Sequence, residues 1–352
     1  ELIIMMKMNK WTVGLAAAGV VSLASTAQAE ENSVLTALSS TVISGNVEAS
    51  YNGTFSKSNN LYGDQGFVAN GASLAIGSPL GEGDYSAGYN VELLLGQRAS
   101  NFSGDPDDFH IKNANIGLNV PFGNGIDLTV GLFDTMVGYE VEASGANPNV
   151  DRSYGFDLEP FTHTGVLAST SLSDSISVSL GLANAFDSTA GLHNGTIDGD
   201  GNFAYLAGLE ITAPESLGFL AGSTLFVGYV DGASVGADND DEDSLFYVGG
   251  SMASPIDGVS LGIAYDDREY GNGQADADAV ALYAVWDVSD GVSLAGRYDT
   301  LDDGSDTKSM WSATLGYSIW ENVLTRLEYN YETGDREDGD SSAIAVNLFY
   351  QF

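Results

Sequence analysis

The final ten residues of the chain follow a two-residue alternation that constrains the fold more than any other feature. Large apolar side chains occupy every second position between residues 343 and 352, namely Ile344, Val346, Leu348, Tyr350 and Phe352. Successive side chains of an extended strand point to opposite faces, so these five share one face. The ends of most domains are poorly ordered. A strand that stays apolar up to Phe352 therefore needs an apolar environment along its whole length.

The first 29 residues have the composition of a secretory signal peptide. Lys7 and Lys10 precede an apolar run, residues 11–24, that is too short to cross a bilayer. Ala27-Gln28-Ala29 then supplies the small residues that signal peptidase requires. We expect this segment to be removed on export, and the alternative is a retained amphipathic helix.

The rest of the chain contains no cysteine and no apolar run long enough for a transmembrane helix. It shows apolar–polar alternation instead, as in Trp311, Ala313, Leu315 and Tyr317, which are separated by serine, threonine and glycine. A soluble β-sandwich has the same periodicity. The export signal and the aromatic end favour a closed barrel, in which every backbone polar group is paired within lipid.

Short and long connections alternate along the chain. Short turns rich in Gly, Pro, Asn, Asp and Ser are predicted at 79–83, 121–125, 173–174, 214–216, 255–258, 289–291 and 320–322. Longer loops are predicted at 56–65, 99–108, 138–160, 188–202, 232–243, 270–276, 302–308 and 333–340. This pattern predicts an all-β fold, a single transmembrane antiparallel β-barrel of about sixteen strands with both ends in the periplasm.

The predicted organisation is simple, with one structured domain. We expect residues 1–29 to be the signal peptide, with residues 1–4 upstream of the true start as an artefact, residues 30–40 to be a short periplasmic lead-in, and residues 41–352 to form the barrel.

The net charge of −38 comes from 49 acidic and 11 basic residues. Such a charge excludes binding to nucleic acid through phosphate neutralisation. Because most of the acids fall in loops, they serve either to solvate the surface or to create a field that favours cations near a pore mouth.

The loop at residues 138–160 is the longest, and we expect it to fold toward the lumen as the third external loop. It contributes candidate constriction residues Tyr139, Glu140, Glu142, Asp151, Arg152, Asp157 and Glu159. The candidate basic wall comprises Arg98 on the third strand and Arg268, Arg297 and Arg326 on strands eleven, thirteen and fifteen. An acidic loop facing a basic wall would produce a transverse field across the constriction.

Two alternatives to this constriction remain open. Each arginine could simply pair with an inward acid, such as Asp299, Glu328 or Asp266. If the loop folded outward, its charges would form a surface cap.

Other chemistry has weaker support in the sequence. His163 could act as a general base for a nucleophilic Ser153 or Ser169. A strand histidine that faces a lumen is the simpler interpretation. We therefore expect that the protein is not an enzyme. Loop-bound calcium is a weak candidate at Asp198 and Asp200, which resemble the start of an EF-hand loop, and at Asp238 and Asp240. We expect no other cofactor.

The last strand and the segment around the third loop resemble known families. Leu348, Tyr350 and Phe352 resemble the sorting signal of Gram-negative outer-membrane barrels. Residues 130–140 (VGLFDTMVGYE), 147–149 (NPN), 153–156 (SYGF) and 159–165 (EPFTHTG) are similar to the OmpL-like beta-barrel porins, the second beta-barrel porin family. Leu132 stands where that family has lysine. The resemblance implies an outer-membrane channel and says little about its substrate.

We therefore predict a porin in the bacterial outer membrane that passes small hydrophilic solutes or ions passively and favours cations. The alternatives are a non-conducting structural or adhesive barrel and an outer-membrane enzyme. The expected partners are outer-membrane lipid and lipopolysaccharide, the barrel-assembly machinery, the diffusing solutes and two further copies in a homotrimer.

Overall fold

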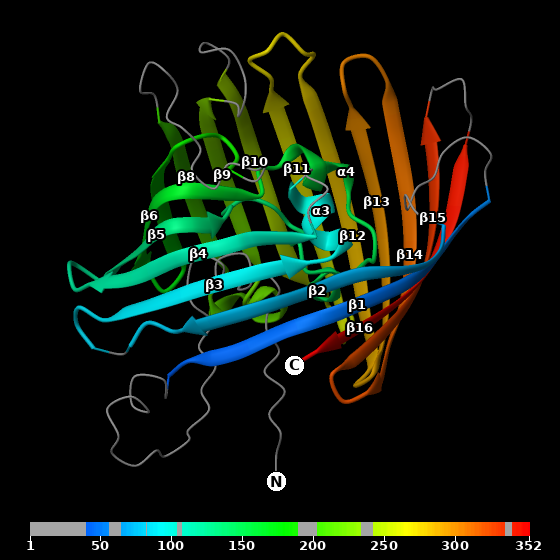
Figure 1. Cartoon of the computed structure of the whole chain (residues 1–352), viewed down its shortest axis with the longest axis horizontal. Helices are drawn as coiled ribbons and strands as arrows, with labels where there is room; N and C mark the ends of the chain where they lie inside the picture. The colour runs from blue at the N-terminus through cyan, green and yellow to red at the C-terminus, as the bar shows by residue number, and fades with distance from the viewer. Residues whose placement is uncertain are drawn as a thin grey trace.

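The computed structural model is a closed barrel of sixteen antiparallel strands (Figure 1). The structure describes residues 40–55, 65–81, 83–103, 108–188, 203–233, 242–334 and 340–352. The predicted signal peptide and most of the lead-in, residues 1–39, lie outside the described residues.

Each strand pairs with its neighbours along the chain, and the strand count agrees with the prediction. The strands are β1 (Val42–Thr54), β2 (Gly66–Ser78), β3 (Ala87–Leu95), β4 (Phe109–Val120), β5 (Ile126–Asp134), β6 (Thr162–Ser173), β7 (Ile176–Ala183), β8 (Ala204–Thr212), β9 (Thr224–Ala233), β10 (Glu242–Ala253), β11 (Val259–Glu269), β12 (Ala277–Ser289), β13 (Val292–Asp302), β14 (Thr307–Trp320), β15 (Val323–Gly334) and β16 (Ser341–Gln351).

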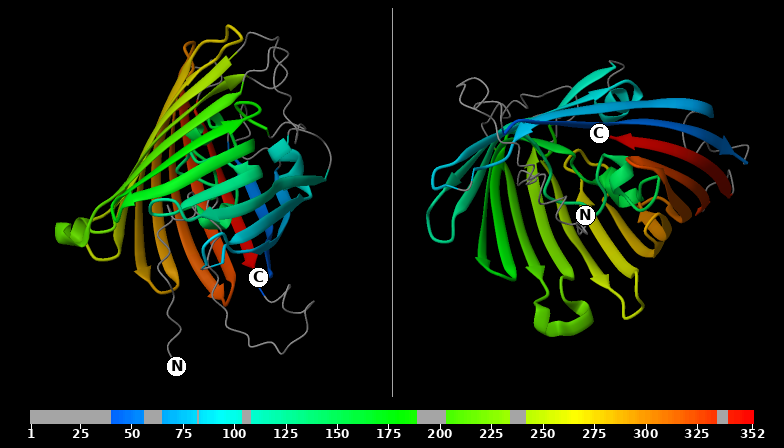
Figure 2. Two further views of the ribbon diagram at one scale, coloured as in Figure 1. Left: turned by 90° about the vertical axis from the view of Figure 1, so that its left-hand side faces the viewer. Right: turned by 90° about the horizontal axis from the view of Figure 1, so that it is seen from below.

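The barrel closes where β16 pairs with β1, from Asn46 opposite Gln351 to Thr54 opposite Ala343. Beyond the strand, Gly45 and Phe352 exchange two backbone hydrogen bonds of 3.0 Å. Figure 2 shows this pair of strands, blue and red, side by side in both views. Closure leaves no strand edge unpaired, as lipid requires.

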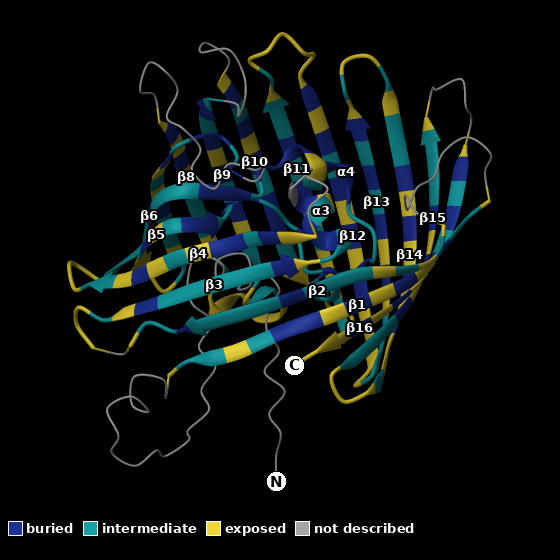
Figure 3. Ribbon diagram, in the orientation of Figure 1, coloured by how far each residue is buried: buried dark blue, intermediate teal, exposed yellow. Residues whose placement is uncertain are grey.

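The two faces of the wall differ in polarity as the alternation predicts. Along β15, Leu327 and Tyr329 are exposed on the outside, while Arg326, Glu328 and Asn330 are buried inside. The same banding of exposed and buried residues runs along the other strands in Figure 3. An apolar exterior around a polar interior is the pattern of a membrane barrel and the reverse of a soluble sandwich.

Two connections differ from the prediction because each contains a short helix. The turn predicted at 214–216 is longer and forms the 3₁₀ segment η2 (Glu215–Leu220). The loop after β3 begins with α3 (Gln97–Ser103). Segments this short lack a readable helical period. Within the described residues, no helix is both long and apolar enough to cross a bilayer.

Candidate functional site: a lumen narrowed by the third loop

The third loop, defined here as residues 135–161 between β5 and β6, lies inside the barrel. It contains η1 (Ser144–Ala146) and α4 (Tyr154–Leu158). Figure 1 and the right-hand view of Figure 2 show α4 within the ring of strands. The prediction that this loop folds toward the lumen is confirmed.

The two ends of the third loop meet at Gly138 and Glu159. Gly138 has a φ of 112°, in the region that favours glycine. A Cβ atom there would lie 2.9 Å from Cδ of Glu159, so the carboxylate of Glu159 fills the space that a larger residue would need. Burial and the neighbouring Asp266 and Glu140 raise the pKa of Glu159 well above its usual value.

Arg297 on β13 fastens the middle of the loop to the wall. Its guanidinium donates to Oε1 of Glu140 at 3.1 Å and to Oδ2 of Asp299 at 2.8 Å. It also donates to the carbonyl oxygens of Asp151 and Arg152 at 2.7 and 2.8 Å. Arg297 is 2% exposed, so its guanidinium group interacts with these partners and not with water in the lumen.

Arg326 on β15 holds the η1 end of the loop chiefly through backbone groups. It donates to the carbonyl oxygens of Ser144, Asn147 and Asn149 at 2.8, 3.2 and 3.0 Å. It also donates to the side chain of Asn347 on β16. The sequence left open that Arg326 simply forms an ion pair with an inward acid such as Glu328. Its hydrogen bonds go instead to loop carbonyl oxygens and to Asn347.

Arg268 on β11 holds the far end of the loop. It donates to the carbonyl oxygen of Leu158 at 2.9 Å and forms an ion pair with Asp243 at 2.6 Å. Its guanidinium also lies 4.6 Å from the ring centroids of Phe186 and Tyr270. The acid that pairs with it is thus Asp243 on β10 rather than Asp266.

Wall carboxylates accept hydrogen bonds from the loop backbone. Glu328 accepts from the N–H groups of Val150 and Asp151 at 2.6 and 2.8 Å. Asp299 accepts from the N–H of Tyr154 at 3.0 Å. Charge-assisted bonds of this kind are stronger than neutral ones, and together they fix the loop against β13–β15.

Arg98 lies on α3 and not on the third strand, where the sequence placed it. β3 ends at Leu95, and the chain then turns into the lumen. From α3, Arg98 makes a two-pronged ion pair with Glu142 of the third loop, at 2.8 and 2.6 Å. It also donates to Asn46 on β1. Arg98 therefore connects the second and third loops from the side opposite Arg297.

Lys112 on β4 is a basic lumen residue that the sequence analysis missed. Its ammonium group binds Glu92 at 3.1 Å and Asp134 at 2.7 Å. The register of β3 and β4 shifts between Glu92 and Leu93, so Lys112 is the extra residue of a β-bulge. Lys112 and Asn113 are consequently both buried inside the barrel. Two successive inward residues break the alternation from which lumen-facing residues are predicted.

The remaining predicted residues occupy different parts of the loop. Arg152 donates to the carbonyl oxygens of Val141, Val150 and Glu142. Asp157 is exposed on α4. The Tyr139 ring stacks on Tyr283 of β12 with 4.0 Å between centroids.

Asp151 faces the remaining lumen from the loop. Its Oδ2 accepts from the side-chain amide of Asn330 at 3.0 Å. Burial raises the pKa of Asp151 to about 7, against the attraction of Arg297.

Two cavities lie between the third loop and the barrel wall. The outer chamber, of about 520 Å³, is lined by the third loop, by α3 and by residues of β1, β2, β14 and β15. The inner chamber, of about 260 Å³, reaches Asn90 near the middle of β3. Nine acidic residues line the two chambers: Glu48, Glu92, Asp134, Glu140, Glu142, Asp151, Asp157, Glu159 and Glu332. Three basic residues line them: Arg98, Lys112 and Arg152.

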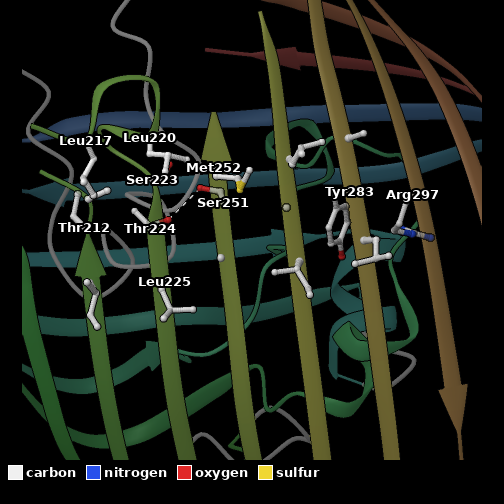
Figure 4. Close-up of a pocket in the computed structure, with 18 of the residues that line it drawn as sticks. Thr212, Leu217, Leu220, Ser223, Thr224, Leu225, Ser251, Met252, Tyr283 and Arg297 are labelled. Carbon is white, nitrogen blue, oxygen red and sulfur yellow. Dashed lines mark hydrogen bonds between the residues drawn. The ribbon is translucent and has the colours of Figure 1, made fainter. Parts of the chain in front are cut away.

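A larger groove, of about 1170 Å³, lies on the outer face of the wall beside η2. Leu217, Leu220, Leu225 and Met252 are among the residues that line it (Figure 4). Because this face carries exposed apolar side chains, its surroundings in a bilayer are lipid. The groove is therefore separate from the aqueous lumen.

The structure does not bring together the residues considered for catalysis. Nε2 of His163 lies 3.1 Å from Thr135, while Ser169 is six residues further along the same strand and pairs with Ser179. The backbone N–H of Ser153 donates to Glu140. The calcium candidates Asp198, Asp200, Asp238 and Asp240 lie outside the described residues.

Comparison with known proteins identifies the class. The chain belongs to the family described as "Putative beta-barrel porin-2, OmpL-like", which matches residues 40–350. A barrel of this family is an outer-membrane porin, and the protein is located in the bacterial outer membrane. Family and fold point to a channel rather than an enzyme. Among curated proteins, no sequence matches the chain significantly.

Solved structures share the fold at low sequence identity. An anion-selective porin from Comamonas acidovorans is 11% identical with a TM-score of 0.64, and the match covers 89% of this chain and 99% of that one. OmpF of Salmonella typhi, solved as a complex with daunomycin, is 14% identical with a TM-score of 0.63 over 89% and 97%. The outer membrane channel DcaP of Acinetobacter baumannii is 13% identical with a TM-score of 0.60 over 89% and 97%.

Proposed function

We propose that this porin passes small hydrophilic solutes by passive diffusion and favours cations. The observation that carries the proposal is the excess of acidic over basic side chains that line the two chambers, nine against three. The basic side chains are engaged: Arg98 and Lys112 form ion pairs, and Arg152 binds loop carbonyls. A passage lined with excess carboxylates concentrates cations and repels anions.

The test is the reversal potential of the purified protein in a planar bilayer under a KCl gradient. We expect cation-selective steps, and we expect Asp157→Asn to lower the ratio of cation to anion permeability, because Asp157 is exposed in the outer chamber. Asp290→Asn makes the same change in an exposed turn between β12 and β13 and should leave the ratio unchanged. An anion-selective or unselective wild-type channel would refute the cation preference.

A non-conducting structural or adhesive barrel remains the alternative, and a bilayer that shows no channel current would favour it.

One neighbour, OmpT of Vibrio cholerae, is described as a trimer form. We propose that this protein is also a homotrimer surrounded by lipid and lipopolysaccharide and inserted by the barrel-assembly machinery through Leu348, Tyr350 and Phe352. Conductance steps in groups of three would support the trimer.

Loop-bound calcium remains a prediction, which a calcium-dependent rise in melting temperature would support.

A further inference from the structure

The outer and inner chambers share four lining residues, and three of them are aromatic. These residues are Glu142, Phe102, Phe156 and Phe161. Phe102 comes from α3, whereas the other three come from the third loop. These three phenylalanine rings and one carboxylate lie where the two chambers meet, and we name them the neck.

The three rings of the neck form one continuous surface. Phe161 stacks on Phe102 with 5.3 Å between centroids and lies 4.9 Å from Phe156 in a tilted arrangement. Phe156 already holds a cation, because the guanidinium of Arg152 lies 5.3 Å from its ring centroid. Aromatic faces attract cations through the negative potential above the ring.

The polar part of the inner chamber offers hydrogen-bond acceptors next to the neck. Glu92 and Asp134 bind Lys112 and also accept from Nδ2 of Asn113. The carbonyl oxygen of the Asn113 side chain, which is 3% exposed, has no hydrogen-bond partner among the described residues. A buried acceptor without a partner needs an explanation, and a solute that brings a donor or a positive charge next to it is one that fits this chamber.

We propose that the neck is a binding site for organic cations that carry an aromatic or flat apolar group, such as aryl ammonium compounds. The ring of such a solute packs on Phe156 and Phe161, while its ammonium group lies beside Glu142 and the acceptors of the inner chamber. This inference rests on the proposed channel function and deepens it, because it names the class of solute that the passage retains.

The probe is a pair of cations of equal charge and similar size. Benzyltrimethylammonium and cyclohexylmethyl-trimethylammonium differ in aromaticity, and each is added to wild-type channels that carry potassium current. We expect the benzyl compound to inhibit the current at a concentration about fivefold lower, because both cations are attracted to the rings of the neck but only the benzyl group adds ring–ring attraction. Neutral benzyl alcohol should inhibit far less than either cation. Equal inhibition by the two cations, or by benzyl alcohol, would overturn the proposal.

A double substitution, Phe156→Leu with Phe161→Leu, keeps the apolar bulk of the neck and removes two rings. In this variant the difference between the two cations should become clearly smaller, because Phe102 is the one ring of the neck that remains. The matched control is Phe246→Leu on the outer face of β10, where Phe246 is 41% exposed and the difference should persist. If the double variant fails to fold, the inhibition of the wild-type channel by the two cations still tests the proposal. A silent wild-type channel would refute the proposed function itself, whereas a potassium current with equal inhibition would refute this inference alone.

Discussion

At the scale of single residues, the basic side chains hold the third loop in place. Seven lysines and arginines fall within the described residues, and six of them belong to the loop or contact it: Arg98, Arg152, Arg268, Arg297, Lys308 and Arg326. The seventh, Lys112, binds Asp134, the residue before the loop begins. Within the described residues, the few basic side chains of this acidic chain therefore lie where they hold the third loop in the lumen.

We expect Asp151 to make the ion selectivity of the lumen depend on pH. Its carboxyl group has a pKa of about 7, so lowering the pH from 8 to 6 protonates it and removes negative charge from the outer chamber. We expect the ratio of cation to anion permeability to fall over this range. In Asp151→Asn the fall should be clearly smaller, as measured by reversal potentials at each pH. A variant with the full wild-type pH dependence would show that another group is responsible.

At the scale of elements, the strands could be predicted because their pattern is local. Alternation fixes the face of each side chain, and turn residues mark where a strand ends, as Trp320-Glu321-Asn322 does between β14 and β15. The partners of the arginines could not be predicted in the same way. Arg326 binds backbone carbonyl oxygens of the loop, and every residue has such an oxygen, so no residue type marks the partners.

Two other misses also have local causes. Arg98 appeared to belong to a strand because α3 is too short for a helical period to be read. Lys112 could not be predicted as a lumen residue because a β-bulge turns it and Asn113 inward together, which breaks the alternation of inward and outward side chains.

The ends of the third loop provide a test at this scale. Gly138→Ala adds a Cβ where the carboxylate of Glu159 lies, in a backbone conformation with a φ of 112°. We expect the loop to loosen, seen as more frequent closures and a broader distribution of single-channel conductance. Gly273→Ala is the matched control, because Gly273 has a φ of 79° and nothing within 4 Å of the added atom. Equal current noise in both variants would contradict a role for the Gly138–Glu159 contact.

At the scale of the whole molecule, the barrel is closed by the seam between the first and last strands. The seam brings together residues nearly 300 positions apart, so closing it costs more chain entropy than pairing two adjacent strands. Gly45 lies at this seam and is covered by the ring of Phe352. The outward side chain of the last strand therefore packs on the first strand, as well as facing lipid.

Gly45→Ala tests the packing of the seam. The added Cβ would lie 2.8 Å from the Phe352 ring and closer still to the carbonyl oxygen of Ser73, so the strands must shift. Overpacking of this kind costs about 1–3 kcal/mol, which should appear as a lower urea midpoint for unfolding from lipid vesicles. Gly53→Ala, on the same face of β1, places its Cβ 3.6 Å from Ile344 and should unfold like the wild type or slightly later. If both variants unfolded at the wild-type midpoint, the close packing of Phe352 on Gly45 would not be what stabilises the closed barrel.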